Sequence, residues 1–161
     1  MSETAPSGKA LLWIDDEPHS LSCERLLLEK SGVHVEWATT IAEATERLNS
    51  KRYDLIILDC MLPPDSPSEE PIRAGVTFLD RLRSGKIGAS CDNRKLKVIV
   101  VTAIGSMHIL ETLRKAEGVE RIMMKPIATR EMHEAIMESL GRSEIGTGIT
   151  TGSTRRHTRR A

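Results

Sequence analysis

Residues Leu55–Asp59 read LIILD, so four aliphatic side chains run directly into a carboxylate. Three other strand-like runs also end on polar residues: Ala10–Ile14 on Asp15 and Asp16, Val98–Val101 on Thr102, and Arg121–Met124 on Lys125. Continuous aliphatic runs are typical of buried parallel strands, whose C-terminal ends share one edge of the sheet, where ligands bind. The pattern therefore predicts one crevice that gathers three carboxylates, a hydroxyl and an ammonium. These groups suit a divalent cation and a phosphoryl group.

Helical and strand-like segments alternate along the chain. Apolar residues that recur every three or four positions predict helices over five segments: Pro18–Lys30, Thr40–Leu48, Gly75–Arg83, Ser106–Ala116 and Thr129–Leu140. Asp16 is the expected N-cap of the first helix, and Thr39 or Thr40 that of the second. Alternation over Val33–Trp37 predicts a strand nearer the sheet edge. Five β–α units predict an α/β fold with a five-stranded doubly wound parallel sheet.

The length of 161 residues suits a single domain, predicted over residues 9–140. Residues 1–8 and 141–161 are expected to be disordered, and the second segment forms a basic tail with five arginines and one acid. Residues 63–74 hold four of the seven prolines and are predicted to form a long insert loop that contacts partners.

Several classes of protein are not expected. The cysteines Cys23, Cys60 and Cys91 lie far apart without the spacing of a metal site, which predicts reduced thiols and a cytoplasmic protein. No segment has the length and apolar character of a membrane span, so no membrane partner is expected. The basic tail has no aromatic residue on which a base could stack, so nucleic-acid binding is not expected either.

Four segments together resemble the receiver domain of two-component response regulators: Leu12–Pro18 (LWIDDEP), Asp54–Pro63 (DLIILDCMLP), Val100–Ala103 (VVTA) and Met124–Pro126 (MKP). The resemblance extends from about Lys9 to Leu140 and implies the flavodoxin-like receiver fold. It further implies that the chain is not an enzyme but a phosphoacceptor signalling domain, which takes part in its own phosphotransfer and dephosphorylation.

The resemblance also implies a role for each residue of the predicted crevice. Asp59 would be the phosphoacceptor, while Thr102 and Lys125 would contact the phosphoryl oxygens. The ligands of an Mg²⁺ cofactor would be Asp15, Asp16, Asp59 and the backbone carbonyl of Met61. The Lys125–Pro126 bond would be cis, as X–Pro bonds can be at low cost. The chemistry agrees, since clustered carboxylates repel unless a cation compensates them and Asp59 must be ionised to act as a nucleophile.

The sequence departs from the family pattern in several places. The helix-starting glycine, expected to be Gly75, comes late after Asp59. Ile122 occupies the position, three residues before the lysine, that commonly carries an aromatic switch residue. No output domain is expected after the receiver-like segment, and the basic tail does not match the family pattern. The resemblance implies that Met61 and Ile104 lie at the mouth of the site, where they would obstruct a hydrolytic water and prolong the life of the phosphate.

The leading hypothesis is a single-domain response regulator that receives its phosphoryl group from a histidine kinase or a phosphotransfer protein and then presents an altered surface to a downstream protein partner. The alternative is a receiver-like interaction module that works without phosphorylation, which Ile122 and the proline-rich insert favour. A hydrolase of the aspartyl-phosphate type is disfavoured, because those enzymes require a second carboxylate where this chain has Met61.

Overall fold

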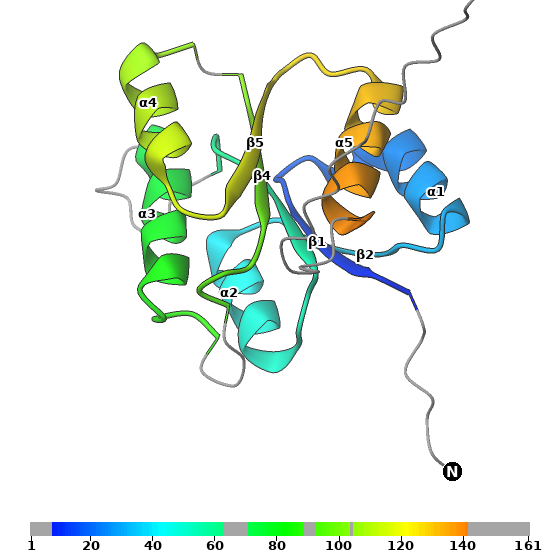
Figure 1. The fold of residues 1–161 in the computed structure, drawn as a ribbon, viewed down its shortest axis with the longest axis horizontal. Helices are drawn as coiled ribbons and strands as arrows, with labels where there is room; N and C mark the ends of the chain where they lie inside the picture. The colour runs from blue at the N-terminus through cyan, green and yellow to red at the C-terminus, as the bar shows by residue number, and fades with distance from the viewer. Residues whose placement is uncertain (1–7, 63–70, 89–92, 104, 142–161) are drawn as a thin grey trace, which may run out of the picture.

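The structure is a computed structural model that describes residues 8–62, 71–88, 93–103 and 105–141. Its centre is a five-stranded sheet in which every neighbouring pair of strands is parallel (Figure 1). The strands are β1 (Ala10–Ile14), β2 (His34–Ala38), β3 (Leu55–Asp59), β4 (Val98–Thr102) and β5 (Val119–Met124). Their order in the sheet is β2-β1-β3-β4-β5. The predicted doubly wound parallel sheet is therefore confirmed.

Five helices cover the two faces of this sheet (Figure 1). They are α1 (Ser22–Lys30), α2 (Ile41–Ser50), α3 (Pro71–Arg83), α4 (Met107–Lys115) and α5 (Thr129–Gly141). Helices α2, α3 and α4 pack on one face around Leu48 and Phe78, whereas α1 and α5 pack on the other around Leu28 and Ile136. All five residues of β3 are buried, as its continuous apolar sequence predicts for a central strand.

The second helix begins where the sequence predicts. The hydroxyl of Thr40 accepts a hydrogen bond from the backbone N–H of Glu43 at 3.1 Å, and the carboxylate of Glu43 accepts one from the N–H of Thr39 at 2.9 Å. The first bond caps the helix start, and the second connects Glu43 to the residue before the cap, one position short of the reciprocal bond of a regular capping box.

The first helix begins later than predicted, and Asp16 is not its cap. Residues Pro18–Leu21 form a 3₁₀ turn, and α1 starts after it at Ser22. The carbonyl of Glu17 accepts bonds from both the N–H and the hydroxyl of Ser20, which closes this tighter turn. Leu21 therefore occupies the cap position of α1, and Asp16 remains exposed.

The third helix begins at Pro71 rather than at Gly75, so the last four residues of the predicted insert are helical. Proline suits a first helical turn because its missing N–H would have no partner there. Gly75 has a different role: a Cβ at this position would lie 2.9 Å from the Cα of Cys60, so glycine allows the helix to approach the end of β3. Residues 63–70 of the insert lie outside the described residues, as do residues 1–7 and 142–161 of the predicted disordered ends.

Candidate functional site

The C-terminal ends of the strands bring the predicted residues together. Asp15 follows β1, Asp59 ends β3, Thr102 ends β4 and Lys125 follows β5. Backbone hydrogen bonds fix this edge: the N–H of Asp15 donates to the carbonyl of Ala38 at 3.0 Å, and that of Lys125 to the carbonyl of Thr102 at 2.9 Å. Residues that are up to 110 positions apart in the sequence therefore meet at one edge of the sheet.

Three carboxylates form the acidic part of the site. One oxygen from each of Asp15, Asp16 and Asp59 lies within 4.8 Å of the others. Asp15 and Asp59 are each only 3% exposed, whereas Asp16 faces solvent. An all-oxygen set with two buried members and one open side is suited to Mg²⁺, which prefers oxygen ligands and keeps several waters.

Lys125 supplies positive charge to this cluster. Its Nζ lies 3.0 Å from Oδ2 of Asp59 and 3.5 Å from Oδ2 of Asp15. Burial disfavours the ammonium, but the hydrogen bond to Asp59 and the attraction of both carboxylates outweigh it and raise the pKa of Lys125. Burial also raises the pKa of Asp15, although the N–H of Glu17 and the charge of Lys125 partly offset this effect. One ammonium thus compensates two buried carboxyl groups only in part.

Both buried carboxylates are oriented by the backbone that follows them. Oδ1 of Asp15 accepts the N–H of Glu17 at 2.8 Å, and Oδ1 of Asp59 accepts the N–H of Met61 at 2.9 Å. Each residue thereby forms a local turn of the Asx type, and its other oxygen is directed at Lys125. The local sequence thus holds each carboxylate in one orientation, which is what a preorganised site requires.

The remaining predicted residues border the cluster. Thr102 is fully buried, and Met61 is 44% exposed immediately after Asp59. The Lys125–Pro126 peptide bond is cis, as predicted. The ligand role of the Met61 carbonyl and the contact of Thr102 with a phosphoryl group stay predictions, and Ile104 lies outside the described residues.

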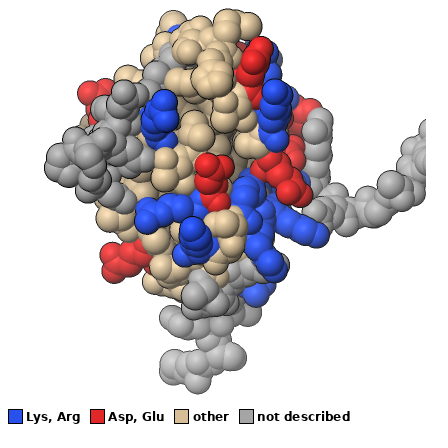
Figure 2. Space-filling model, turned by 90° about the vertical axis from the view of Figure 1, so that its left-hand side faces the viewer, with Lys and Arg blue, Asp and Glu red and all other residues tan. Residues whose placement is uncertain are grey.

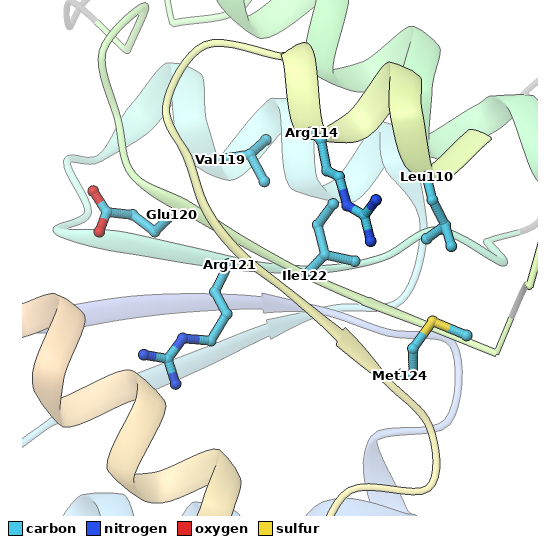
Figure 3. Close-up of a pocket in the computed structure, with 7 residues that line it drawn as sticks. All are labelled: Leu110, Arg114, Val119, Glu120, Arg121, Ile122 and Met124. Atoms are coloured by element: carbon cyan, nitrogen blue, oxygen red, sulfur yellow. The ribbon is translucent and has the colours of Figure 1, made fainter. Parts of the chain in front are cut away.

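A hollow of about 250 Å³ lies between α4 and β5 and extends along β5 from Val119 to Met124, which ends the strand at this edge (Figure 3). Leu110 and Arg114 enter it from α4, and Ile122 and Met124 enter it from β5 (Figure 3). Met124 is the β5 partner of Thr102 in the sheet register, so the hollow begins beside the site. Sequence reasoning identified Ile122 but missed the hollow, for which the closely spaced apolar residues of β5 were the available signal.

Sequence reasoning also missed a polar network at the sheet edge. Glu36 on β2 accepts hydrogen bonds from Lys51 and from the hydroxyl of Tyr53, and it contacts His34 at 3.2 Å. Burial alone would raise the pKa of Glu36, but these hydrogen bonds lower it to about 2. Lys51 and Tyr53 lie 15 and 17 positions after Glu36, so no local pattern in the sequence predicts their hydrogen bonds to it.

Comparison with known proteins agrees with the geometry. A family model described as the response regulator receiver domain matches residues 11–137. The chain is similar to the alkaline phosphatase synthesis transcriptional regulatory protein PhoP of Bacillus subtilis, with 28% identity over 138 residues, 86% of this chain and 51% of PhoP. It is also similar to the signal transduction histidine-protein kinase BarA of Shigella flexneri, with 25% identity over 94% of this chain and 14% of BarA. The chain thus spans about half the length of the first relative and a small part of the second.

Solved structures show the same fold. A CheY-like response regulator receiver domain protein from Methanospirillum hungatei JF-1 superposes with a TM-score of 0.67 and 27% identity, over 84% of this chain and 95% of that one. A sensor histidine kinase receiver domain from Pseudomonas aeruginosa PAO1 superposes with a TM-score of 0.64 and 21% identity, over 84% of this chain and 99% of that one. That second structure carries a magnesium ion coordinated in its active-site cleft.

Proposed function

Because this chain belongs to the response regulator receiver domain family of two-component signal transduction, we propose that it accepts a phosphoryl group on Asp59 from a histidine kinase or a phosphotransfer protein. The observation that carries the proposal is the environment of that carboxylate. Asp59 is 3% exposed, the N–H of Met61 orients it, and the ammonium of Lys125 lies 3.0 Å away. A buried, oriented carboxylate beside a fixed cation is well suited to act as a nucleophile toward phosphorus.

In the proposed transfer, a carboxylate oxygen of Asp59 forms the new bond to phosphorus. The phosphorus–nitrogen bond of a phosphohistidine donor breaks, and its electron pair returns to the donor imidazole. The ammonium of Lys125 would contact the phosphoryl oxygens, because it already lies beside Asp59 and Asp15. Thr102, which is buried at the end of β4, would offer its hydroxyl to the same oxygens.

The donor set fits Mg²⁺. Three carboxylates face one ammonium, which leaves an excess of negative charge in a partly buried cluster that a divalent cation would neutralise. Asp15, Asp16, Asp59 and the carbonyl of Met61 would hold the ion. When bound, Mg²⁺ would supply charge neutralisation and orientation for the phosphoryl oxygens.

The proposed output is a changed surface between α4 and β5, read by a downstream protein partner. Thr102 pairs with Met124 across β4 and β5, so a movement of Thr102 would alter packing at the edge of the hollow. Ile122 lines that hollow and cannot form a side-chain hydrogen bond. The signal would therefore travel through apolar packing rather than through a polar switch.

The cytoplasm is the proposed setting. Cys23 and Cys60 are free thiols, as expected in a reducing compartment. Within the described part of the chain, no helix is long and apolar enough to cross a membrane.

Acetyl phosphate with Mg²⁺ tests the function. Intact-mass measurement is expected to find one phosphate on the wild type and none on Asp59→Asn, while Asp80→Asn, which changes an exposed acid on α3, serves as a labelled control. Labelling of Asp59→Asn would contradict the assignment. A wild type that remains unlabelled would instead favour the interaction module that works without phosphorylation.

Asp16 offers a second test of the metal site. Its side chain is exposed, so Asp16→Ala is expected to keep the fold while it abolishes or greatly weakens the rise in melting temperature that Mg²⁺ produces. An unchanged rise would remove Asp16 from the proposed ligand set.

A further inference from the structure

Basic side chains gather on the side of the molecule formed by α3 and α4, below the middle of the view in Figure 2. Described positions from 73 to 117 hold nine Lys or Arg and three Asp or Glu. Residues 8–62, which include the three site carboxylates Asp15, Asp16 and Asp59, hold six basic and ten acidic residues. The described chain therefore has a basic stretch from 73 to 117 and an acidic stretch over 8–62, although the sequence as a whole is neutral.

Arg83 draws three segments of the basic side together. Its Nε donates to the carbonyl of Glu117 at 2.5 Å, and its Nη1 donates to the carbonyl of Arg94 at 2.9 Å. The end of α3, the segment before β4 and the turn after α4 therefore meet at this guanidinium. The exposed cations at the end of α3, in the segment before β4 and in the last turn of α4 form what we call the α3–α4 basic surface: Arg81, Lys86, Arg94, Lys95, Arg114 and Lys115.

Most described cations outside residues 73–117 form an ion pair, whereas most members of the α3–α4 basic surface form none with a described acid. Seven of the nine Lys and Arg outside residues 73–117 in the described chain form an ion pair, such as Arg25 with Glu29 and Arg130 with Glu134. Five members of the basic surface, all except Arg94, form no ion pair with a described acid. Cations without paired acids add their fields, and such a surface attracts an anionic partner and speeds its approach.

The basic surface lies at the opposite end of the sheet from Asp59. Helices α3 and α4 run antiparallel to the strands that precede them, so their C-terminal ends lie at the edge where β4 and β5 begin (Figure 1). Asp59 lies at the edge where the strands end. A molecule bound to the basic surface would therefore leave the crevice open to a phosphoryl donor.

We propose that the α3–α4 basic surface binds an acidic segment of a protein partner, and that it does so while Asp59 remains accessible for phosphotransfer. Charge complementarity supports this occupant. Single-stranded nucleic acid is disfavoured, because it requires aromatic rings for stacking and the described aromatic residues lie elsewhere: Trp13, Tyr53 and Phe78 are buried, and Trp37 is on the far edge strand β2.

Fluorescence anisotropy with a labelled decaglutamate peptide tests the proposal on the full chain. Binding is expected at about 20 mM salt and should weaken toward about 200 mM, because screening shortens the range of the attraction. The variant Lys86→Glu/Lys115→Glu should bind about tenfold more weakly, because each reversal turns an attraction into a repulsion. The control Lys30→Glu/Arg52→Glu makes the same charge change at two exposed cations outside the surface and should bind like the wild type.

Further outcomes decide between the occupants. Lys86→Gln/Lys115→Gln keeps the test valid if the reversal variant fails to fold, and it should also weaken binding. Absence of binding to the wild type would overturn the proposal. An equal loss of binding in the surface variant and the control variant would also overturn it, because the attraction would then come from net charge or from the basic tail. If a ten-nucleotide oligothymidylate binds more tightly than decaglutamate, and if this binding depends on Lys86 and Lys115, nucleic acid would be the occupant. Loss of acetyl phosphate labelling in the presence of saturating peptide would refute the claim that Asp59 remains accessible while the basic surface is occupied.

Discussion

Lys125→Met is predicted to destabilise the protein in the absence of Mg²⁺. Methionine has nearly the length of the lysine stem and removes only the charge. In the native site the ammonium lies 3.0 Å from Asp59 and 3.5 Å from Asp15, both of which are 3% exposed. Without Lys125, two nearly buried carboxylates would remain together with no cation in contact, an arrangement that the folded state tolerates poorly.

The expected loss follows from these contacts. At an effective dielectric constant of about 20, each contact corresponds to about 5 kcal/mol of attraction, most of which offsets the cost of burying the charges. Removing one partner of a buried pair costs about 3–5 kcal/mol. The side chain of Lys125 is 37% exposed, and solvent screening reduces this to about 2 kcal/mol. In a domain of this size, that loss lowers the melting temperature by about 4–8 °C.

Thermal melts of wild type and Lys125→Met in EDTA and in saturating Mg²⁺ measure the effect. Mg²⁺ bound among the carboxylates would supply the missing positive charge, so the gap between the two proteins should narrow in its presence. Lys115→Met, at an exposed lysine that forms no ion pair with a described acid, is the matched control and should melt like the wild type. Equal melting of Lys125→Met and wild type in EDTA, or a gap that Mg²⁺ leaves unchanged, would refute the role given to Lys125.

Three further substitutions test other parts of the molecule. Because the pKa of Glu36 is lowered from 4.5 to about 2, the stability that its carboxylate gives to the fold is complete above pH 4.5 and is lost as the pH falls toward 2. Urea unfolding should show Glu36→Gln about 2 kcal/mol less stable than wild type at pH 7, with a smaller difference in stability at pH 3. Gly75→Ala should cost about 1–3 kcal/mol in the same assay, because its Cβ would lie 2.9 Å from the Cα of Cys60, whereas Gly105→Ala meets no atom within 4 Å and should be neutral. Met61→Asn should hasten decay of the aspartyl phosphate about tenfold, since an amide can orient the attacking water and a thioether cannot. Intact-mass measurement over time gives the decay rate, and an unchanged or slower rate would show that Met61 does not set it.

The fold and the acidic site could be predicted because their signals are local. A run such as Leu55–Leu58 is buried on both faces, so its composition alone identifies a central strand, and the next residue must lie at the sheet edge. Because neighbouring strands are parallel, the ends of the other strands lie at the same edge, as the pairing of Thr102 with Met124 illustrates. Capping at Thr40 was predictable for the same reason, since its partner Glu43 is three residues away.

The features that sequence reasoning missed depend on contacts between distant segments. Asp16 has the residue type of an N-cap, but the 3₁₀ turn at Pro18–Leu21 moves the helix start to Ser22 and leaves that carboxylate in the acidic cluster. The cluster of prolines before Pro71 predicts a loop, yet Pro71 suits the first turn of α3. The network at Glu36 joins residues 15 and 17 positions away, where no periodicity reaches.

The alternation of strand and helix explains how one small domain can hold two sites of opposite charge. Each connection that leaves a strand lies at the edge with Asp59, and each connection that leaves α3 or α4 lies at the other edge, next to Arg83. The acidic residues for which we propose metal and phosphoryl chemistry lie at the first edge, apart from the cations at the second. The two edges share α4, in which Leu110 and Arg114 line the hollow and Arg114 and Lys115 belong to the basic surface. A displacement of α4 on phosphorylation would consequently move one part of the basic surface relative to α3. If α4 moves as a rigid helix, the affinity for decaglutamate should differ between beryllofluoride-treated and untreated protein. If α4 does not move, the two affinities should be equal.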